Sequence, residues 1–235
     1  MKTYSKIYIF IYASVMIIIV ASVLSFTAIS LKPLQDKNIE IEKKQDILSS
    51  INVFSVPDDA EEKFNKYITN SYVINFKGEM QEGDAFYIDI KEELNKSLEQ
   101  RKLPILECTK DDGSEKFIIP VRGKGLWGPI WGYIALNDDY NTIYGATFGH
   151  EKETPGLGSD IDQDWFQEPF KGKQLFDKSG KFRCIEIVKG GAAPDNIHGV
   201  DGISGGTITS KGLEAMLKDC LSNYVTYFRN KTKIK

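Results

Sequence analysis

The stretch from Phe117 to Phe148, FIIPVRGKGLWGPIWGYIALNDDYNTIYGATF, decides the fold. Three short runs within it, residues 117–121, 129–136 and 142–148, are rich in β-branched and aromatic residues. Glycine-rich segments and the turn sequence Asn137-Asp138-Asp139 separate these runs, which is typical of consecutive strands joined by tight turns. We therefore predict a β-meander in the middle of the chain.

After this stretch, the C-terminal region has a helical pattern. Apolar residues recur at intervals of three and four, which predicts a long helix with one buried face. They are Leu213, Met216, Leu217, Cys220, Leu221, Tyr224, Val225 and Phe228. Together with the meander, this helix predicts an α+β fold, in which helices pack on an antiparallel sheet.

Shorter elements are expected on either side of the meander. We predict a helix starting at Pro57-Asp58-Asp59, a strand-like segment over residues 86–88 and a strand over residues 182–188. Residues 162–171 are predicted to form a short helix whose apolar face carries Trp165, Phe166 and Phe170.

The N-terminal region has a long uncharged run from Ile7 to Leu31. As a helix this run would be about 37 Å long, enough to cross about 30 Å of hydrocarbon. A cleaved signal peptide is the alternative, but its apolar region is usually only about 7–15 residues long and ends in a small-residue cleavage site. We predict a cytoplasmic N-terminus (1–6), a transmembrane anchor (7–31), a membrane-proximal stalk (32–56) and an extracytoplasmic domain (57–235).

The orientation of the anchor depends on more than lysine counting. Lys2 and Lys6 precede the span, whereas Lys32, Lys37, Lys43 and Lys44 follow it. Counting alone does not favour a cytoplasmic N-terminus, but long domains translocate largely regardless of flanking charge. An external domain therefore remains our expectation.

Composition excludes several classes of protein. The 235 residues include 30 basic and 33 acidic ones, so the chain lacks the strongly basic balance typical of nucleic-acid-binding domains. Three cysteines make no disulfide framework, and Cys184 and Cys220 are predicted to be small core residues. With only His150 and His198 in the chain, we expect no metal site.

Two motif-like strings are predicted to have unremarkable roles. Gly123–Gly128 has the spacing G-x-G-x-x-G, but a dinucleotide site needs a helix after it, and Pro129 with an apolar strand-like run follows instead. We interpret it as a turn between strands. Gly202–Gly206 matches the hydrolase motif G-x-S-x-G, yet no histidine follows Ser204 to take its proton. A serine hydrolase would need an unfamiliar arrangement.

A third string, Asp201 to Ser210 (DGISGGTITS), combines glycines with several hydroxyl side chains just before the C-terminal helix. Free N–H groups and the helix dipole at such a position stabilise a phosphate. A Ser/Thr side chain that only caps the helix is the alternative. From the residues alone, an anion site and a plain cap both remain open.

The segment Asp201-x-x-Ser204-Gly205-Gly206-Thr207 resembles the flavinylation motif of the FMN-binding domain family, which usually has Ala where this chain has Gly206. The strings GLWGPIWGY (125–133), GATFGH (145–150) and ETPGLG (153–158) are similar to the same family. Within it, the whole chain resembles the C subunits of sodium-translocating NADH:quinone reductases. The related G subunits of Rnf-type ferredoxin-linked complexes share the flavin motif, but the GLWGPIWG string and the length favour the former.

This resemblance implies a function and a set of site residues. It implies FMN held by a phosphoester on Thr207, attached from FAD by a separate flavin transferase. It also implies electron relay from NADH towards quinone within a six-subunit, sodium-pumping complex of the bacterial inner membrane, with this domain on the periplasmic side. A flavin-free structural subunit is the alternative.

The implied flavin site has two parts. Around the phosphate we expect Asp201, Ser204, Gly205, Gly206 and Thr209, with Thr209 as the competitor to Thr207 for attachment. Near the ring we expect Glu153, Thr154, Gly156, Leu157 and Gly158, where Pro155 and the glycines set a rigid turn without bulk. We expect no catalytic residue beyond the flavin.

Overall fold

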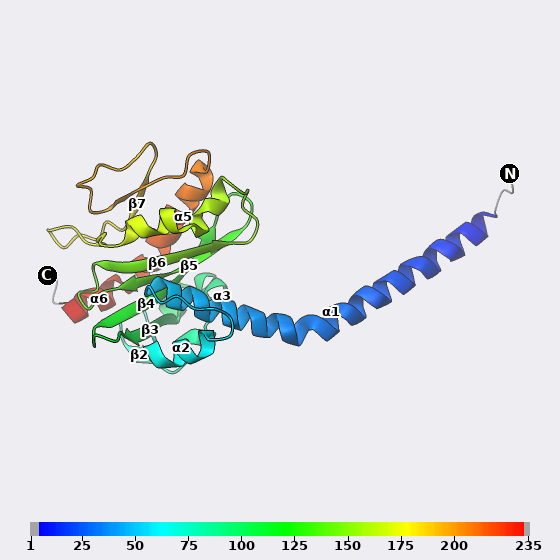
Figure 1. Cartoon of the computed structure of the whole chain (residues 1–235), viewed down its shortest axis with the longest axis horizontal. Helices are drawn as coiled ribbons and strands as arrows, with labels where there is room; N and C mark the ends of the chain where they lie inside the picture. The colour runs from blue at the N-terminus through cyan, green and yellow to red at the C-terminus, as the bar shows by residue number, and fades with distance from the viewer. Residues whose placement is uncertain (1–4, 233–235) are drawn as a thin grey trace. The chain divides into compact units, whose positions relative to one another are not determined.

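The computed structural model describes residues 5–232 and contains two compact units, which divide between Lys43 and Lys44 (Figure 1). Helix α1 (Lys6–Ser50) runs through the first unit and ends in the second. Its first part exposes nearly all of its large apolar side chains, from Ile7 to Ile39. Within the described residues, α1 is the one helix long and apolar enough to cross a membrane. The predicted long apolar N-terminal helix is confirmed.

The second unit is built on a six-stranded antiparallel sheet in the order β2-β1-β3-β4-β5-β6. The strands are β1 (Ile68–Ile74), β2 (Met80–Gln81), β3 (Leu103–Thr109), β4 (Glu115–Lys124), β5 (Pro129–Leu136) and β6 (Ile143–His150). Strands β4, β5 and β6 pair as consecutive neighbours, which confirms the predicted meander. The Gly123–Gly128 segment joins β4 to β5, closed by a 2.9 Å bond from the Gly125 N–H to the Gly128 carbonyl.

One face of the sheet packs against the C-terminal helices. These are α5 (Thr207–Leu221), the 3-10 turn η5 (Ser222–Tyr224) and α6 (Val225–Thr232). The predicted buried face is confirmed except at Val225, which is half-buried. The helix is interrupted at η5 because the Asn223 side chain donates to the carbonyls of Asp219 and Cys220, and the Ser222 hydroxyl donates to that of Asp219.

The opposite face is covered by the end of α1, by α2 (Ala60–Tyr67) and by the 3-10 turn η1 (Ala85–Tyr87). Ile47, Leu48 and Ile51 are fully buried there. At Gly145 on β6 a side chain would meet the Ser50 carbonyl at 2.3 Å, so glycine permits the close contact. Residues 44–56, which the sequence assigns to the stalk, therefore contribute to the hydrophobic core on this face of the sheet.

Three local expectations were wrong or only partly met. Residues 86–88 form no strand, because the Asp84 side chain accepts the Phe86 N–H at 2.9 Å and starts a 3-10 turn. Residues 182–188 form a strand only at β7 (Glu186–Val188), which pairs in parallel with β8 (Gly199–Asp201), while Phe182 makes an isolated bridge to Phe176. Cys184 has a φ of +62°, which breaks the strand before β7.

The predicted helix over 162–171 is split into shorter turns. They are η3 (Gly158–Asp162), α4 (Asp164–Gln167) and η4 (Glu168–Phe170). Phe166 and Phe170 are buried as expected, but Trp165 is 55% exposed and does not belong to the apolar face. The remaining short elements are α3 (Ile90–Leu94) and η2 (Leu98–Gln100).

Candidate functional site

The DGISGGTITS string forms the end of β8, a tight loop and the first turn of α5. Gly206 occupies the N-cap position, so no side chain caps this helix. Among the described residues, the N–H groups of Thr207, Ile208 and Thr209 have no hydrogen-bond acceptor. Uncapped first-turn N–H groups favour an anion. The structure therefore lacks the side-chain cap that the sequence left open as the alternative.

The loop before Thr207 depends on its glycines. Gly205 has a φ of +77°, in the left-handed region, and a Cβ there would lie 2.5 Å from Leu157 Cδ2. Gly206 is buried, and a Cβ there would lie 3.0 Å from Ile203 Cγ2. The loop thereby brings the ETPGLG segment against the start of α5.

The hydroxyl groups of the string fall into two sets. Ser204 and Thr207 are exposed, whereas Thr209 and Ser210 are buried. The Thr209 hydroxyl donates to Glu153 Oε2 at 2.6 Å, and Ser210 Oγ accepts the Ile203 N–H at 3.2 Å. Thr207 therefore presents an accessible oxygen at the uncapped helix end, while the oxygen of Thr209 is engaged inside the protein.

Glu153 connects the three segments of the site. Its buried carboxylate accepts the Thr209 hydroxyl on one oxygen and the Trp127 N–H, at 2.9 Å, on the other. Gly125 and Gly158 leave room for it, since a Cβ at either position would meet its oxygens at 2.5–2.6 Å. The structure thus places Glu153 beneath the loops, joining the β4–β5 turn to α5.

Electrostatics keep this carboxylate ionised. Burial raises the pKa of Glu153, but the Thr209 hydroxyl and the N–H groups of Trp127 and Gly128 lower it, and the net pKa lies below its ordinary value of 4.5. A carboxylate that accepts several hydrogen bonds is a fixed structural charge at neutral pH.

The other predicted residues of the ETPGLG segment form a compact turn. The Thr154 carbonyl accepts the N–H groups of Leu157 at 3.1 Å and of Ser159 at 3.2 Å, and Gly156 has a φ of +73°. Asp201 lies at the end of β8, where Oδ1 accepts the Ala192 N–H at 2.7 Å and ties down the 189–192 loop. Hydrogen bonds to the Thr154 carbonyl thus fix the ETPGLG turn, and the Asp201 side chain fixes the 189–192 loop.

Sequence reasoning missed the exposed apolar side chains on these same segments. Leu126 and Trp127 lie on the β4–β5 turn, Leu157 on the ETPGLG turn and Ile208 in the first turn of α5, each 40–64% exposed. Large apolar residues in a glycine-rich turn, where no core position is expected, were the signal that could have identified them. Such side chains can form one wall of a site for a planar aromatic ligand.

Two lysines were also missed. Lys189 and Lys211 line a small pocket together with Ile187, Gly202, Ile203, Thr207 and Ser210. Lys211 lies one helical turn after Thr207, and its ammonium group pairs with Glu214 at 3.0 Å. These two cations beside the Thr207 hydroxyl suit a phosphate attached there.

The histidines do not support a hydrolase. His150 Nδ1 accepts the Glu153 N–H at 3.3 Å, and His198 Nδ1 lies 2.6 Å from the Gln174 carbonyl. Neither imidazole is hydrogen-bonded to Ser204. The described residues also include no cluster of side chains that could hold a metal ion.

Comparisons with known proteins identify relatives of this chain. Residues 125–222 match the model of the FMN-binding domain family. The C subunit of the Na(+)-translocating NADH-quinone reductase of Vibrio vulnificus is 32% identical over 208 residues, covering 82% of this chain and 81% of the relative. The corresponding protein of Haemophilus ducreyi is 32% identical over 217 residues, covering 86% and 84%.

A solved structure extends the similarity to three dimensions. The crystal structure of the C subunit of the Na(+)-translocating NADH-quinone reductase of Parabacteroides distasonis is 44% identical, with a TM-score of 0.78, and the match covers 84% of this chain and 96% of that one. The α+β fold with its antiparallel sheet is thus shared with a member of that group. This chain belongs to the family of C subunits of Na+-translocating NADH-quinone reductases.

Proposed function

We propose that this protein carries FMN in a phosphoester bond to Thr207 and relays electrons from NADH towards quinone in a sodium-pumping complex. One observation carries the proposal: Thr207 presents an exposed hydroxyl at the uncapped start of α5, two residues after the left-handed Gly205. A phosphate on that oxygen lies against free N–H groups and beside Lys189 and Lys211.

The residues of the site have separate tasks in this proposal. Thr207 is the nucleophile: a flavin transferase would join its oxygen to the FMN phosphoryl group of FAD while the pyrophosphate bond breaks, AMP leaves and the hydroxyl proton is released. Thr207 takes no further part in turnover. Ser204, Gly205 and Gly206 surround the phosphate. The bound flavin supplies reversible electron transfer, and the protein supplies binding, orientation and electrostatics.

The ring side is assigned to the ETPGLG turn. Thr154, Gly156 and Gly158 shape that turn, and Leu157 is the side chain that contacts the ring, with Leu126, Trp127 and Ile208 as exposed apolar neighbours that exclude water. Glu153 and Thr209, whose polar groups bond to each other, act by holding the three segments in place. Asp201 holds the 189–192 loop beside the phosphate.

A fluorescence experiment tests the attachment. The full chain is co-expressed with a flavin transferase, and the denatured protein band is viewed under ultraviolet light. Thr207→Val keeps the β-branched shape and removes the nucleophile, so the band should lose its fluorescence while the protein stays folded. Thr209→Val and Ser204→Ala should retain it. Flavin on the Thr207→Val protein, or flavin found on Thr209 by mass spectrometry, would refute the assignment.

We also propose a single-pass inner-membrane topology with the domain on the periplasmic side. The long apolar part of α1 supports a membrane anchor, and long domains cross regardless of flanking lysines. Protease added to spheroplasts should then digest the domain. Protection of the domain would reverse the proposed orientation, and a mature N-terminus near residue 30 would indicate a signal peptide.

A further inference from the structure

A groove of about 700 Å³ lies between α3, the end of β4, α5 and η5. Its cationic side chains are Lys91, Arg101, Arg122 and Lys124, and Asp219 is the one carboxylate that lines it. Ala215, Met216 and Leu94 give it a partly apolar floor. We call this surface the cationic groove.

The positive charge of the groove exceeds its negative charge, since four cationic side chains line it beside Asp219. Among residues 5–232, no ion pair involves its four cationic side chains. A further carboxylate, Glu151, interacts electrostatically with Arg122 and Lys91 but pairs with Lys152 at 2.8 Å. Unpaired cations that converge in a concave surface attract an anionic partner.

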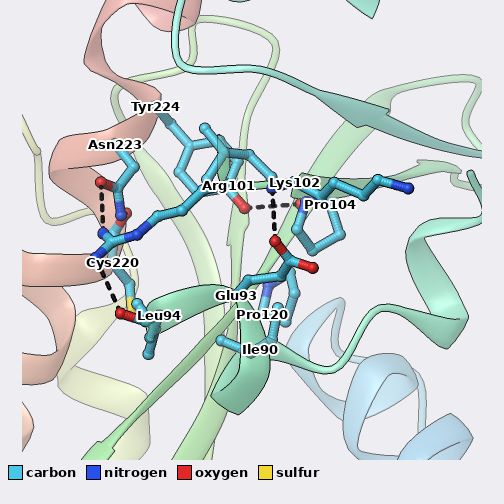
Figure 2. Close-up of a pocket in the computed structure, with 11 residues that line it drawn as sticks. Ile90, Glu93, Leu94, Arg101, Lys102, Pro104, Pro120, Cys220, Asn223 and Tyr224 are labelled. Carbon is cyan, nitrogen blue, oxygen red and sulfur yellow. Dashed lines mark hydrogen bonds between the residues drawn. The ribbon is translucent and has the colours of Figure 1, made fainter. Parts of the chain in front are cut away.

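Arg101 is held in position at one end of the groove. Its guanidinium donates to the Leu94 carbonyl at 3.0 Å, to the Lys96 carbonyl at 3.1 Å and to Asn223 Oδ1 at 3.3 Å. Figure 2 shows this side chain extended between Leu94 and Asn223. Because its partners are neutral carbonyl oxygens, Arg101 keeps its full positive charge. A partner that binds there loses no entropy in ordering this side chain, since the protein already holds it.

The other end of the groove borders the candidate flavin site. A Cβ at Gly212 would lie 2.3 Å from the Lys124 carbonyl, so the β4–β5 turn rests directly on α5 at this position. Thr207 precedes Gly212 by five residues, or about 7.5 Å along the helix axis. The same turn carries Trp127, whose N–H reaches Glu153. A partner in the groove therefore contacts α5, the helix that begins at Thr207 and carries it on a different side.

We infer that the cationic groove docks an acidic polypeptide segment of another protein of the complex, and so determines which partner exchanges electrons with the flavin. This inference rests on the proposed flavin at Thr207. Electrostatic complementarity speeds the encounter and fixes the orientation of weak electron-transfer pairs. An acidic segment matches the excess of positive charge, and its apolar side chains match Met216, Ala215 and Leu94.

Zero-length carbodiimide coupling in the assembled membrane complex tests the contact. The reagent activates a carboxylate, and a lysine amine in direct contact then forms an amide with it as the urea leaves. We expect intersubunit products at Lys91 and Lys124 that decrease as NaCl is added. Lys178 and Lys181, exposed on the turn that follows Asp177, are the matched controls and should give none.

Charge reversal tests the functional consequence. Arg122→Glu with Lys124→Glu should slow reduction or oxidation of the flavin by roughly tenfold, because two attractions become repulsions. Lys178→Glu with Lys181→Glu carries the same change in charge and should leave the rate unaltered. Lys124→Glu alone, at an exposed position, covers the case in which the double variant does not fold.

The outcomes separate this inference from the proposed function. Fluorescence of the denatured band on the same samples reports the attached flavin. Absence of flavin from the unaltered protein would refute the proposed function, and the cross-linking products would still report whether the groove contacts another subunit. Absence of intersubunit products at both groove lysines, or equal rates in the groove and control variants, would overturn the docking inference. Protection of these lysines by phosphatidylglycerol vesicles, without intersubunit products, would assign the groove to lipid and overturn it as well.

Discussion

The hydroxyl of Thr209 donates a 2.6 Å hydrogen bond to Glu153 across 56 positions of sequence, and both side chains are buried. This bond joins the first turn of α5 to the segment after β6. Because the second Glu153 oxygen accepts the Trp127 N–H, one carboxylate orders the helix start and both neighbouring turns. The exposed Thr207 hydroxyl lies in the same first turn of α5.

The first prediction concerns that bond. Thr209→Val preserves shape but leaves the buried carboxylate without one of its donors, which should lower the free energy of unfolding by about 1–3 kcal/mol. Thr209→Ser keeps the hydroxyl and should recover most of the loss. Urea unfolding of both variants in detergent measures the difference. Equal stability of the Val and Ser variants would show that the bond contributes nothing.

The second prediction concerns acid stability. The pKa of Glu153 in the folded protein lies below its ordinary value of 4.5, so its contribution to stability is present above about pH 4.5 and is lost as the pH falls through the folded pKa. Glu153→Gln should be destabilised at neutral pH, and its deficit should shrink under acidic conditions. Unfolding curves at several pH values test this. A deficit that does not change with pH would contradict it.

The third prediction separates backbone strain from contact at Gly205. Gly205 and Gly172 both have a φ of +77°, but a Cβ at Gly172 meets nothing within 4 Å, whereas one at Gly205 would clash with Leu157. Gly172→Ala should cost about 1 kcal/mol through the left-handed conformation alone. Gly205→Ala should cost more and should reduce flavin fluorescence in the denatured band. Full fluorescence of the Gly205 variant would remove the steric argument.

The structure also shows what surrounds Gly206, where the FMN-binding domain family usually has alanine. A Cβ at Gly206 would lie 3.0–3.2 Å from atoms of Ile203 and Leu157, so these neighbours must move by a few tenths of an ångström. Alanine at this position therefore requires a small shift of the Ile203 side chain.

The periodicity of apolar residues predicted those helices and strands that are buried along one side. The meander of β4, β5 and β6 and the buried face of α5 follow from periodicity, because each element meets the core along one side. Elements set by a single side chain were not predictable in this way. Asp84 turns residues 85–87 into a 3-10 turn, and Asn223 ends α5 through bonds to two carbonyls.

The candidate site could be predicted in part. The residue pattern alone identified the helix start but did not separate Thr207 from Thr209, because both hydroxyls belong to one short string. The choice of Thr207 came from the resemblance to the flavinylation motif. Only the distant Glu153 separates them, by turning Thr209 inward. The cationic groove was also hidden, since its side chains come from segments between Lys91 and Asn223 that are not adjacent in sequence.

The fourth prediction concerns the cysteines. Burial raises the pKa of the Cys108 and Cys220 thiols to about 11 and that of Cys184 to about 12. Since the thiolate is the reactive form, all three should resist an aromatic disulfide reagent at neutral pH in the folded protein and react once it is unfolded. Rapid labelling of any one of them in the native protein would show local opening of its surroundings.

The last prediction concerns the end of α1. Ile47 is fully buried against the sheet, whereas Ile39, on the same helix, is 61% exposed. Ile47→Ala in the full chain should therefore lower the free energy of unfolding of the domain by about 2–5 kcal/mol, through lost burial and a cavity. Ile39→Ala removes the same atoms from an exposed position and should change it by less than about 0.5 kcal/mol. Thermal unfolding of both variants in detergent, followed by circular dichroism, compares them directly.

Equal melting temperatures would mean that the last turns of α1 do not support the domain. A selective loss at Ile47 would mean that the membrane-anchoring helix ends as part of the core beneath the flavin domain's sheet, so that any truncation beyond Lys43 removes core residues together with the anchor.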